Sequence, residues 1–133
     1  MIGYNYKLAN LNAALGYSQF KRLREYLKLK RNLYEYYNKF FLNFKFAYIK
    51  KEPKNSKSNY WLQTLVLNKA DMKLRNKIIN ELTLKNIFVR PVWKLIHKLK
   101  HFSNYPKMDL SQSLILEKKI INLPSSSHIN FKK

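Results

Sequence analysis

Residues 3–19, GYNYKLANLNAALGYSQ, are the stretch onto which the rest of this chain is built. The stretch begins with a short cluster of polar and aromatic residues and continues into a helical pattern for which Asn10 is a possible N-cap. A cluster of this kind ahead of a helix can present side chains to a ligand. It could equally be an ordinary turn in which Asn5 hydrogen-bonds its own backbone, and the residues alone leave both interpretations open.

Composition indicates one folded domain with a strongly basic surface. The 133 residues are 46% hydrophobic, and the net charge is +20. Such a charge is typical of proteins that bind nucleic acid or anionic surfaces. Here, however, the cations are scattered along the chain and Lys greatly outnumbers Arg. Protein surfaces that bind nucleic acid instead concentrate their positive charge and rely on Arg. A solvated basic surface is therefore favoured, and a small basic binding protein is kept as the alternative function.

The chain contains no cysteine, which excludes disulfides and cysteine-ligated metal sites. A reducing compartment is permitted, and we expect a cytoplasmic protein. No apolar run approaches the roughly 20 residues that span a bilayer, and the N-terminus lacks a signal-peptide pattern. Membrane insertion and secretion are disfavoured.

Apolar residues between positions 8 and 41 recur with helical spacing, which predicts one long helix over residues 11–41, with a kink allowed. Three tyrosines on it are expected to pack rather than to react, because aromatic stripes at helical spacing are usually core; these are Tyr34, Tyr36 and Tyr37. The opposite face carries four cations that we interpret as solvated: Lys21, Arg22, Lys28 and Arg31.

The next segments predict a loop, a strand and a second helix. Residues 50–58, KKEPKNSKS, have no apolar anchor and are typical of an exposed loop. Residues 60–67, YWLQTLVL, are rich in β-formers and predict the central strand, buried on both faces. Asp71 can cap a helix that ends near Asn86.

The remaining pattern predicts a strand, a helix and a last strand. Residues 87–92, IFVRPV, form the strand, which Pro91 restricts to an edge or an end. Residues 110–119 are helical in spacing, and residues 120–123 form a short strand that Pro124 closes. The predicted fold class is α/β: a long helix leads into a small sheet with helices packed against it.

Few residues could carry chemistry on their own. His97 and His101 are four positions apart, as zinc ligands on a helix can be, but no carboxylate nearby completes a site. No pair of carboxylates is spaced as a general acid and base, and two glycines cannot form a dinucleotide-binding or P-loop motif. We therefore predict no metal site and no catalytic residue.

The segment RPVWKLIH gathers Arg90, Trp93 and His97 at the end of a predicted strand. An arginine there suits an anionic ligand, because its fork matches phosphate geometry. An arginine stacked on Trp93 in a structural turn is an equal alternative.

The order of five segments resembles that of the DegT-type sugar aminotransferases. GYNYKLANLNAALGYSQ is similar to the family's GYNYR(M)xNxxAALGxxQL segment. It is followed by KLKRNLYEYY, SNYWLQTLVL, LTLKNIFVRPVWKLIHKL and IINLPSSSHI, which look like successive family landmarks along nearly the whole chain. The RPVWxLxH and NxPSS forms look most like the branch that serves nonulosonic (legionaminic-type) acid pathways.

The resemblance implies the C-terminal part of a fold type I aminotransferase. Residues 1–43 would form a long interface helix region and residues 59–133 a small α/β domain. Such enzymes use pyridoxal phosphate to move an amino group from glutamate to a nucleotide-linked 4-keto sugar for surface-polysaccharide or nonulosonic-acid biosynthesis. The family's Schiff-base lysine lies upstream of the GYNY segment. We therefore expect a fragment that is inactive alone and that acts as a homodimer or with a complementary N-terminal half.

The resemblance also assigns site residues. Asn5 matches the family asparagine that reaches across the dimer to the cofactor phosphate of the neighbouring subunit, and an amide is a suitable donor to a phosphate oxygen. Lys7 departs from the usual arginine and offers no fork. Arg90, Trp93 and His97 match positions near the substrate end of the pocket.

Overall fold

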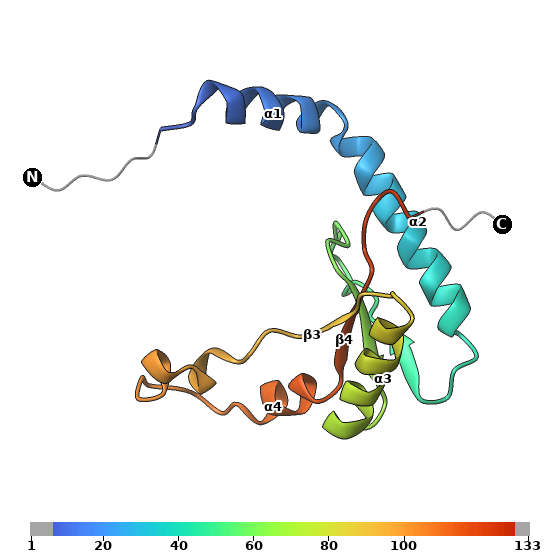
Figure 1. The fold of residues 1–133 in the computed structure, drawn as a ribbon, viewed down its shortest axis with the longest axis vertical. Coiled ribbons are helices and arrows are strands. Elements are labelled where there is room, and N and C mark those ends of the chain that lie inside the picture. The colour runs from blue at the N-terminus through green and yellow to red at the C-terminus, as the bar shows by residue number, and fades with distance from the viewer. Residues whose placement is uncertain (1–6, 130–133) are drawn as a thin grey trace, which may run out of the picture.

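A computed structural model describes residues 7–129, in which helices pack against a small sheet (Figure 1). The mixture of helices and a sheet confirms the predicted class. In chain order the elements are α1 (Asn10–Lys21), α2 (Leu23–Phe41), β1 (Ala47–Ile49), β2 (Gln63–Leu67), α3 (Met72–Leu84), β3 (Arg90–Pro91), the 3-10 helices η1 (Ile96–Lys98) and η2 (Lys100–Phe102), α4 (Ser111–Glu117) and β4 (Ile120–Leu123).

The four strands form one antiparallel sheet in the order β1-β2-β4-β3. The central position of the predicted strand 60–67 is confirmed, because β2 lies between β1 and β4. The strand is shorter than predicted: only residues 63–67 pair, and Trp61 is 64% exposed rather than buried. Pro91 lies on the edge strand β3, as its missing N–H requires. Only two residues of the predicted strand 87–92 pair, and β1 was not predicted because its three residues are too short for a periodic signal.

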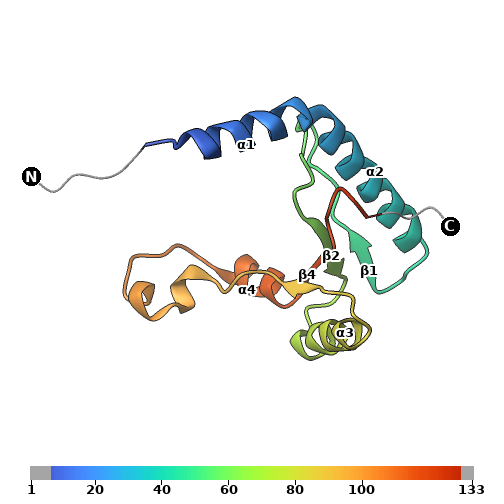
Figure 2. The same cartoon turned by 45° about the horizontal axis from the view of Figure 1, so that its top comes forward.

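The core lies on one face of this sheet. Alternation places Leu65, Ile121 and their same-face neighbours toward the helices. Helix α2 packs beside β1, and α3 packs beside β3 and β4 (Figure 2). The helix residues that meet the core are Tyr34, Tyr37 and Phe41 from α2 and Ile78, Ile79 and Leu82 from α3. On the other face of β2, Val66 is also buried and Thr64 is half-buried.

The predicted long helix is two helices. Arg22, with φ −96° and ψ 3°, leaves helical geometry and separates α1 from α2. Its guanidinium donates to Glu25 at 3.0 Å and 3.1 Å and lies over the ring of Tyr26, so it is paired rather than simply solvated. Helix α1 contains no buried residue and projects away from the sheet (Figures 1 and 2).

Both ends of α3 follow the sequence prediction. The carboxylate of Asp71 accepts the backbone N–H of Leu74 at 2.9 Å, as an N-cap does. At the other end Asn86 takes the left-handed conformation, with φ 60°. The N–H of Ile87 then donates to the carbonyl of Leu82 at 2.9 Å, which completes a Schellman-type stop.

The loop over residues 50–58 is tied to α2, and this corrects the interpretation of Arg31. The Arg31 guanidinium was expected to be solvated, but it is half-buried and holds both carboxylate oxygens of Glu52, at 2.8 Å and 3.3 Å. It also donates to the carbonyl of Ser58 at 3.0 Å. The pattern of a solvated helix face could not reveal this pair, because Glu52 is 21 residues away.

The Arg31–Glu52 pair predicts a pH-dependent loop. Hydrogen bonds from Arg31 and from the Ser58 N–H hold the pKa of Glu52 below its ordinary value. The unfolded carboxyl has a pKa of about 4.3, so this stabilisation is complete above that pH and is lost as the pH falls through the lower folded pKa. We expect amide protection of residues 50–58 in hydrogen–deuterium exchange, corrected for intrinsic rates, to fall on acidification.

A matched variant isolates the effect. Glu52→Gln keeps the shape of the side chain but cannot titrate, so its loop should exchange faster near neutral pH and show no further loss on acidification. An identical pH dependence in the wild type and in Glu52→Gln would contradict this account.

Candidate functional site

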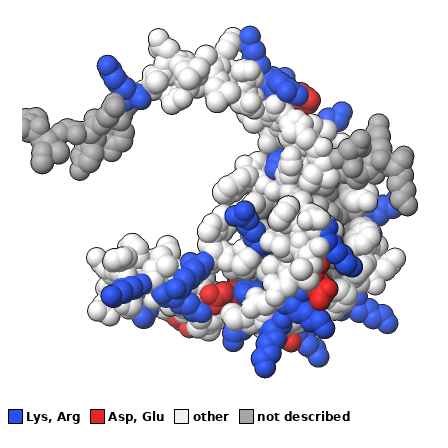
Figure 3. Space-filling model, viewed as in Figure 1, with Lys and Arg blue, Asp and Glu red and all other residues white. Residues whose placement is uncertain are grey.

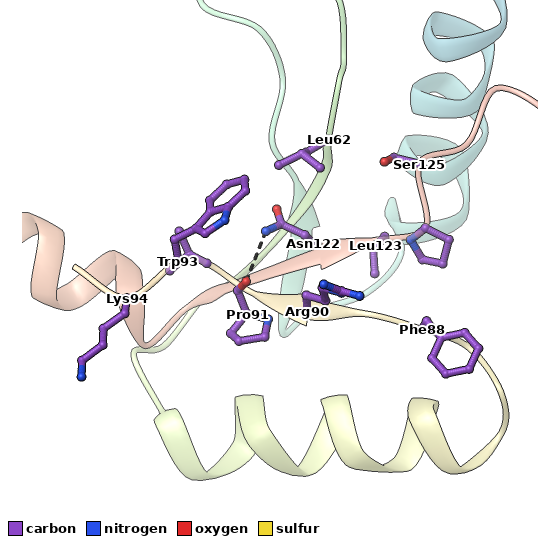
Figure 4. A pocket seen from close by; sticks show the side chains of 11 residues that line it. Leu62, Phe88, Arg90, Pro91, Trp93, Lys94, Asn122, Leu123 and Ser125 are labelled. Atoms are coloured by element: carbon purple, nitrogen blue, oxygen red, sulfur yellow. Dashed lines mark hydrogen bonds between the residues drawn. The ribbon is translucent and has the colours of Figure 1, made fainter. Parts of the chain in front are cut away.

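The sheet face away from the helices carries polar residues from three strands. In the strand register Asn122 lies opposite both Thr64 and Arg90, so the three share that face. The Thr64 hydroxyl and the Asn122 Oδ1 are 3.4 Å apart, and the Asn122 amide donates to the carbonyl of Pro91 at 3.4 Å (Figure 4). Asn122 therefore links the central strands to the edge strand at the point where Arg90 emerges.

A cavity of about 550 Å³ lies over this edge of the sheet. Arg90 and Trp93 both line it, so the structure brings together two of the predicted site residues. Figure 4 shows Leu62, Trp93 and Asn122 on the side of the sheet away from α3. No carboxylate is among its lining residues, which makes the cavity suitable for an anionic ligand. The lining residues are Leu62, Phe88, Arg90, Pro91, Val92, Trp93, Lys94, Asn122, Leu123, Pro124 and Ser125.

The ring of Trp93 stacks on that of Trp61, with centroids 6.0 Å apart and planes at 29°. The stacking partner that the sequence suggested was Arg90, whereas the structure provides a second indole. Trp93 remains 64% exposed, so one surface of its ring is open to a ligand. Tyr60, with a positive φ of 47°, turns the chain at this point.

His97 lines a neighbouring cavity of about 620 Å³, and Trp93 contributes to both cavities. His97 and His101 lie in separate 3-10 helices, η1 and η2, so they do not share the face of one helix. Within residues 7–129 no three His, Asp or Glu side chains come together as a metal ion would require.

Lys30 supports the first cavity from the α2 side. Its ammonium donates to the carbonyl of Trp61 at 3.2 Å and to the carbonyl of Ser125. Burial lowers the pKa of Lys30. The hydroxyl of Tyr37 donates to the carbonyl of Pro124 at 3.0 Å, so α2 fixes the start of the PSSS segment at two points. The sequence pattern does not reveal this role of Lys30, because its partners lie 31 and 95 residues away.

Comparison with known protein families matches residues 1–133 to the DegT/DnrJ/EryC1/StrS aminotransferase family. The chain belongs to this family. The match confirms the resemblance drawn from the five ordered segments.

Curated relatives are sugar aminotransferases. The chain is 30% identical over 126 residues to GDP-perosamine synthase of Escherichia coli O157:H7, and 29% identical over 128 residues to that of Vibrio cholerae. These alignments cover 94% of this chain but 33% and 34% of the relatives. The chain thus spans about a third of the length of the curated relatives it matches.

Solved structures of sugar aminotransferases share the fold. Helicobacter pylori PseC, an aminotransferase involved in the biosynthesis of pseudoaminic acid, has a TM-score of 0.88 at 19% identity, over 98% of this chain and 36% of that one. DesI, solved in the presence of its TDP-sugar product, has a TM-score of 0.86 at 17% identity, over 96% of this chain and 33% of that one. The fold is therefore that of part of a fold type I aminotransferase.

The described residues do not by themselves make a complete site for the pyridoxal phosphate that this family uses. Asn5 lies outside the described residues. Burial lowers the pKa of Lys30, yet its ammonium is held by two carbonyls and it is not among the residues that line either cavity. The arrangement fits the binding of an anionic ligand beside Arg90 and Trp93.

Proposed function

We propose that this chain forms the small-domain wall of a pyridoxal-phosphate aminotransferase that moves an amino group from glutamate to a nucleotide-linked 4-keto sugar, for surface-polysaccharide or nonulosonic-acid biosynthesis. The carboxylate-free cavity at Arg90 and Trp93 carries the proposal. The division into residues 1–43 and 59–133 stays a prediction. The proposed compartment is the cytoplasm, with which a chain without cysteine is compatible.

Each residue of the wall has a chemical role in this proposal. Arg90 offers a planar fork to a phosphate or carboxylate of the substrate. Trp93 offers an exposed ring surface for a sugar or base, and it stacks on Trp61. His97 lines the adjoining cavity, where its imidazole can hydrogen-bond substrate hydroxyl groups.

The proposed partner is a second subunit or a complementary segment that brings the cofactor lysine, with Asn5 donating to the cofactor phosphate. Helix α1 supports this, because its apolar side chains are uncovered: Leu11 is 80% exposed and Phe20 is 69% exposed. Exposed apolar surface of this kind is typical of an interface. Within residues 7–129 no helix has the length and apolarity that crossing a membrane would require.

The testing experiment combines the chain with a segment that carries the family's cofactor lysine, loaded with pyridoxal phosphate. We expect glutamate-dependent amination of a GDP-linked 4-keto sugar, followed as formation of 2-oxoglutarate. In that complex Arg90→Gln should raise KM for the sugar by about 10- to 100-fold, the range expected when a hydrogen bond to a charged group is lost, while kcat changes little.

Two controls make this test specific. Arg90→Lys keeps the charge but not the fork, so it should fall between the wild type and Arg90→Gln. Lys73→Gln removes an exposed charge of α3 and should leave KM unchanged. A complex with no glutamate-dependent activity, or an unchanged KM in Arg90→Gln, would count against the proposal.

A further inference from the structure

A separate cavity lies between α2 and the loop that follows β1. Arg24, Lys28 and Arg31 are spaced by four and three residues, so they share one face of α2. Residues 57–59 form the opposing wall, and the volume is about 590 Å³. This cavity shares no lining residue with the cavities at Arg90 and His97.

The groups that line this cavity are mostly donors without acceptors. Within residues 7–129 the side chains of Arg24, Lys28 and Lys57 have no hydrogen-bond or ion-pair partner. The Ser58 hydroxyl oxygen accepts the N–H of Tyr60 at 3.0 Å, so its own O–H is available to donate. The side-chain Oδ1 of Asn59 accepts the N–H of Trp61 at 3.0 Å, so the side-chain NH2 group of Asn59 is available to donate. No carboxylate lines the cavity.

The two walls are held in place by an ion pair that lies beside the unpartnered cations. Arg31 donates from Nη1 and Nη2 to the carboxylate of Glu52 and lies over the ring of Tyr60, 5.1 Å from its centroid. The Ser58 N–H donates to Glu52 at 2.7 Å. The charge of Glu52 is therefore used by Arg31 and does not neutralise Arg24, Lys28 or Lys57.

We propose that this cavity is a binding site for a small phosphate-rich anion of the diphosphate class. Three cations without a side-chain partner, a hydroxyl and an amide line one cavity, and this set of donors suits the several acceptor oxygens of linked phosphates. On the face that Figure 3 shows, Lys and Arg side chains occur on several separate parts of the surface. A bounded hollow with three such cations favours a small anion over nucleic acid, which would need a row of phosphate contacts.

Helix geometry adds a consequence for stability. Arg24 and Lys28 are like charges four residues apart on α2, an arrangement that destabilises a helix. A bound anion removes this repulsion, and a ligand that binds only the folded state raises its stability by RT ln(1 + L/Kd), where L is the free ligand concentration. The melting temperature should therefore rise with pyrophosphate.

The test is titration of the full chain with inorganic pyrophosphate. Calorimetry measures the binding, and the melting temperature measures the stabilisation. We expect saturable binding of one pyrophosphate per chain at moderate salt. Arg24→Gln, Lys28→Gln and Lys57→Gln should each weaken binding by about tenfold, the size expected for one charge-assisted hydrogen bond. Lys28→Arg should bind within about threefold of the wild type, because it keeps a cationic donor.

Matched controls decide between a site and general surface charge. Lys73→Gln and Lys77→Gln remove exposed cations of α3, so they should leave the affinity for pyrophosphate unchanged. The proposal is overturned if pyrophosphate binding does not saturate, or if the site variants and the control variants lose the same affinity for it. It is also overturned if DNA binds more tightly than pyrophosphate and the site and control variants weaken DNA binding equally. Circular dichroism of each variant excludes unfolding as the cause, and no cofactor or sugar is used, so the outcome does not depend on the proposed aminotransferase activity.

Discussion

Incubation of the isolated chain with pyridoxal phosphate is expected to give no single, stoichiometric covalent adduct. A specific adduct requires a lysine with a depressed pKa in a shaped pocket. Lys30 meets the first condition, because burial lowers its pKa, but its ammonium is occupied by the carbonyls of Trp61 and Ser125. Borohydride reduction and peptide mapping should therefore find slow, scattered labelling of exposed lysines.

Lys30→Arg provides the matched control, because it keeps a cationic donor but cannot form the adduct. Its labelling pattern should equal that of the wild type. In the complex with a complementary segment, the label should map to that segment. A single adduct on this chain that glutamate reverses, and that Lys30→Arg abolishes, would mean that Lys30 is catalytic and that the proposed division of labour is wrong.

The parts of the fold that the sequence predicted well are those set by local chemistry. Asp71 and Asn86 mark the two ends of α3 through their own backbone geometry, a cap hydrogen bond and a positive φ. Strand β4 matches the predicted residues 120–123, and Pro124 closes it. Such signals are contained within four or five residues, so no tertiary information is needed to find them.

The parts that were missed depend on distant pairing. Strand β1 has three residues and is held by its register with Leu65, Val66 and Leu67 of β2. A strand that short has no detectable period of its own. The η1 and η2 helices were not predicted, because each is three residues long and too short for a periodic signal.

The candidate site was predicted in its local part and missed in its supporting part. Arg90 and Trp93 are three residues apart and line one cavity, as their common motif suggested. Trp61 and Asn122 come from other strands, and Lys30 comes from α2. Strand order and the helix–sheet contact bring them together, and neither is encoded in the spacing of one motif.

Ile121→Ala is expected to lower the free energy of unfolding by about 3 kcal/mol, within the range for a fully buried isoleucine that leaves a cavity. Ile121 is 0% exposed and lies on the central strand β4 between Leu65 of β2 and Pro91 of β3. Its loss removes apolar contact in the middle of the sheet, where neighbouring strands cannot close the gap without breaking register.

Urea unfolding followed by circular dichroism measures the effect, with Leu84→Ala as the control. Leu84 is the last residue of α3 and is 80% exposed, so its truncation should change stability by less than about 0.5 kcal/mol. Ile121→Val should lie between the two, at about 1 kcal/mol. Equal losses at positions 121 and 84 would contradict the packing described. Because β4 leads directly into Pro124 and Ser125, we expect Ile121→Ala to loosen the Arg90 cavity as well.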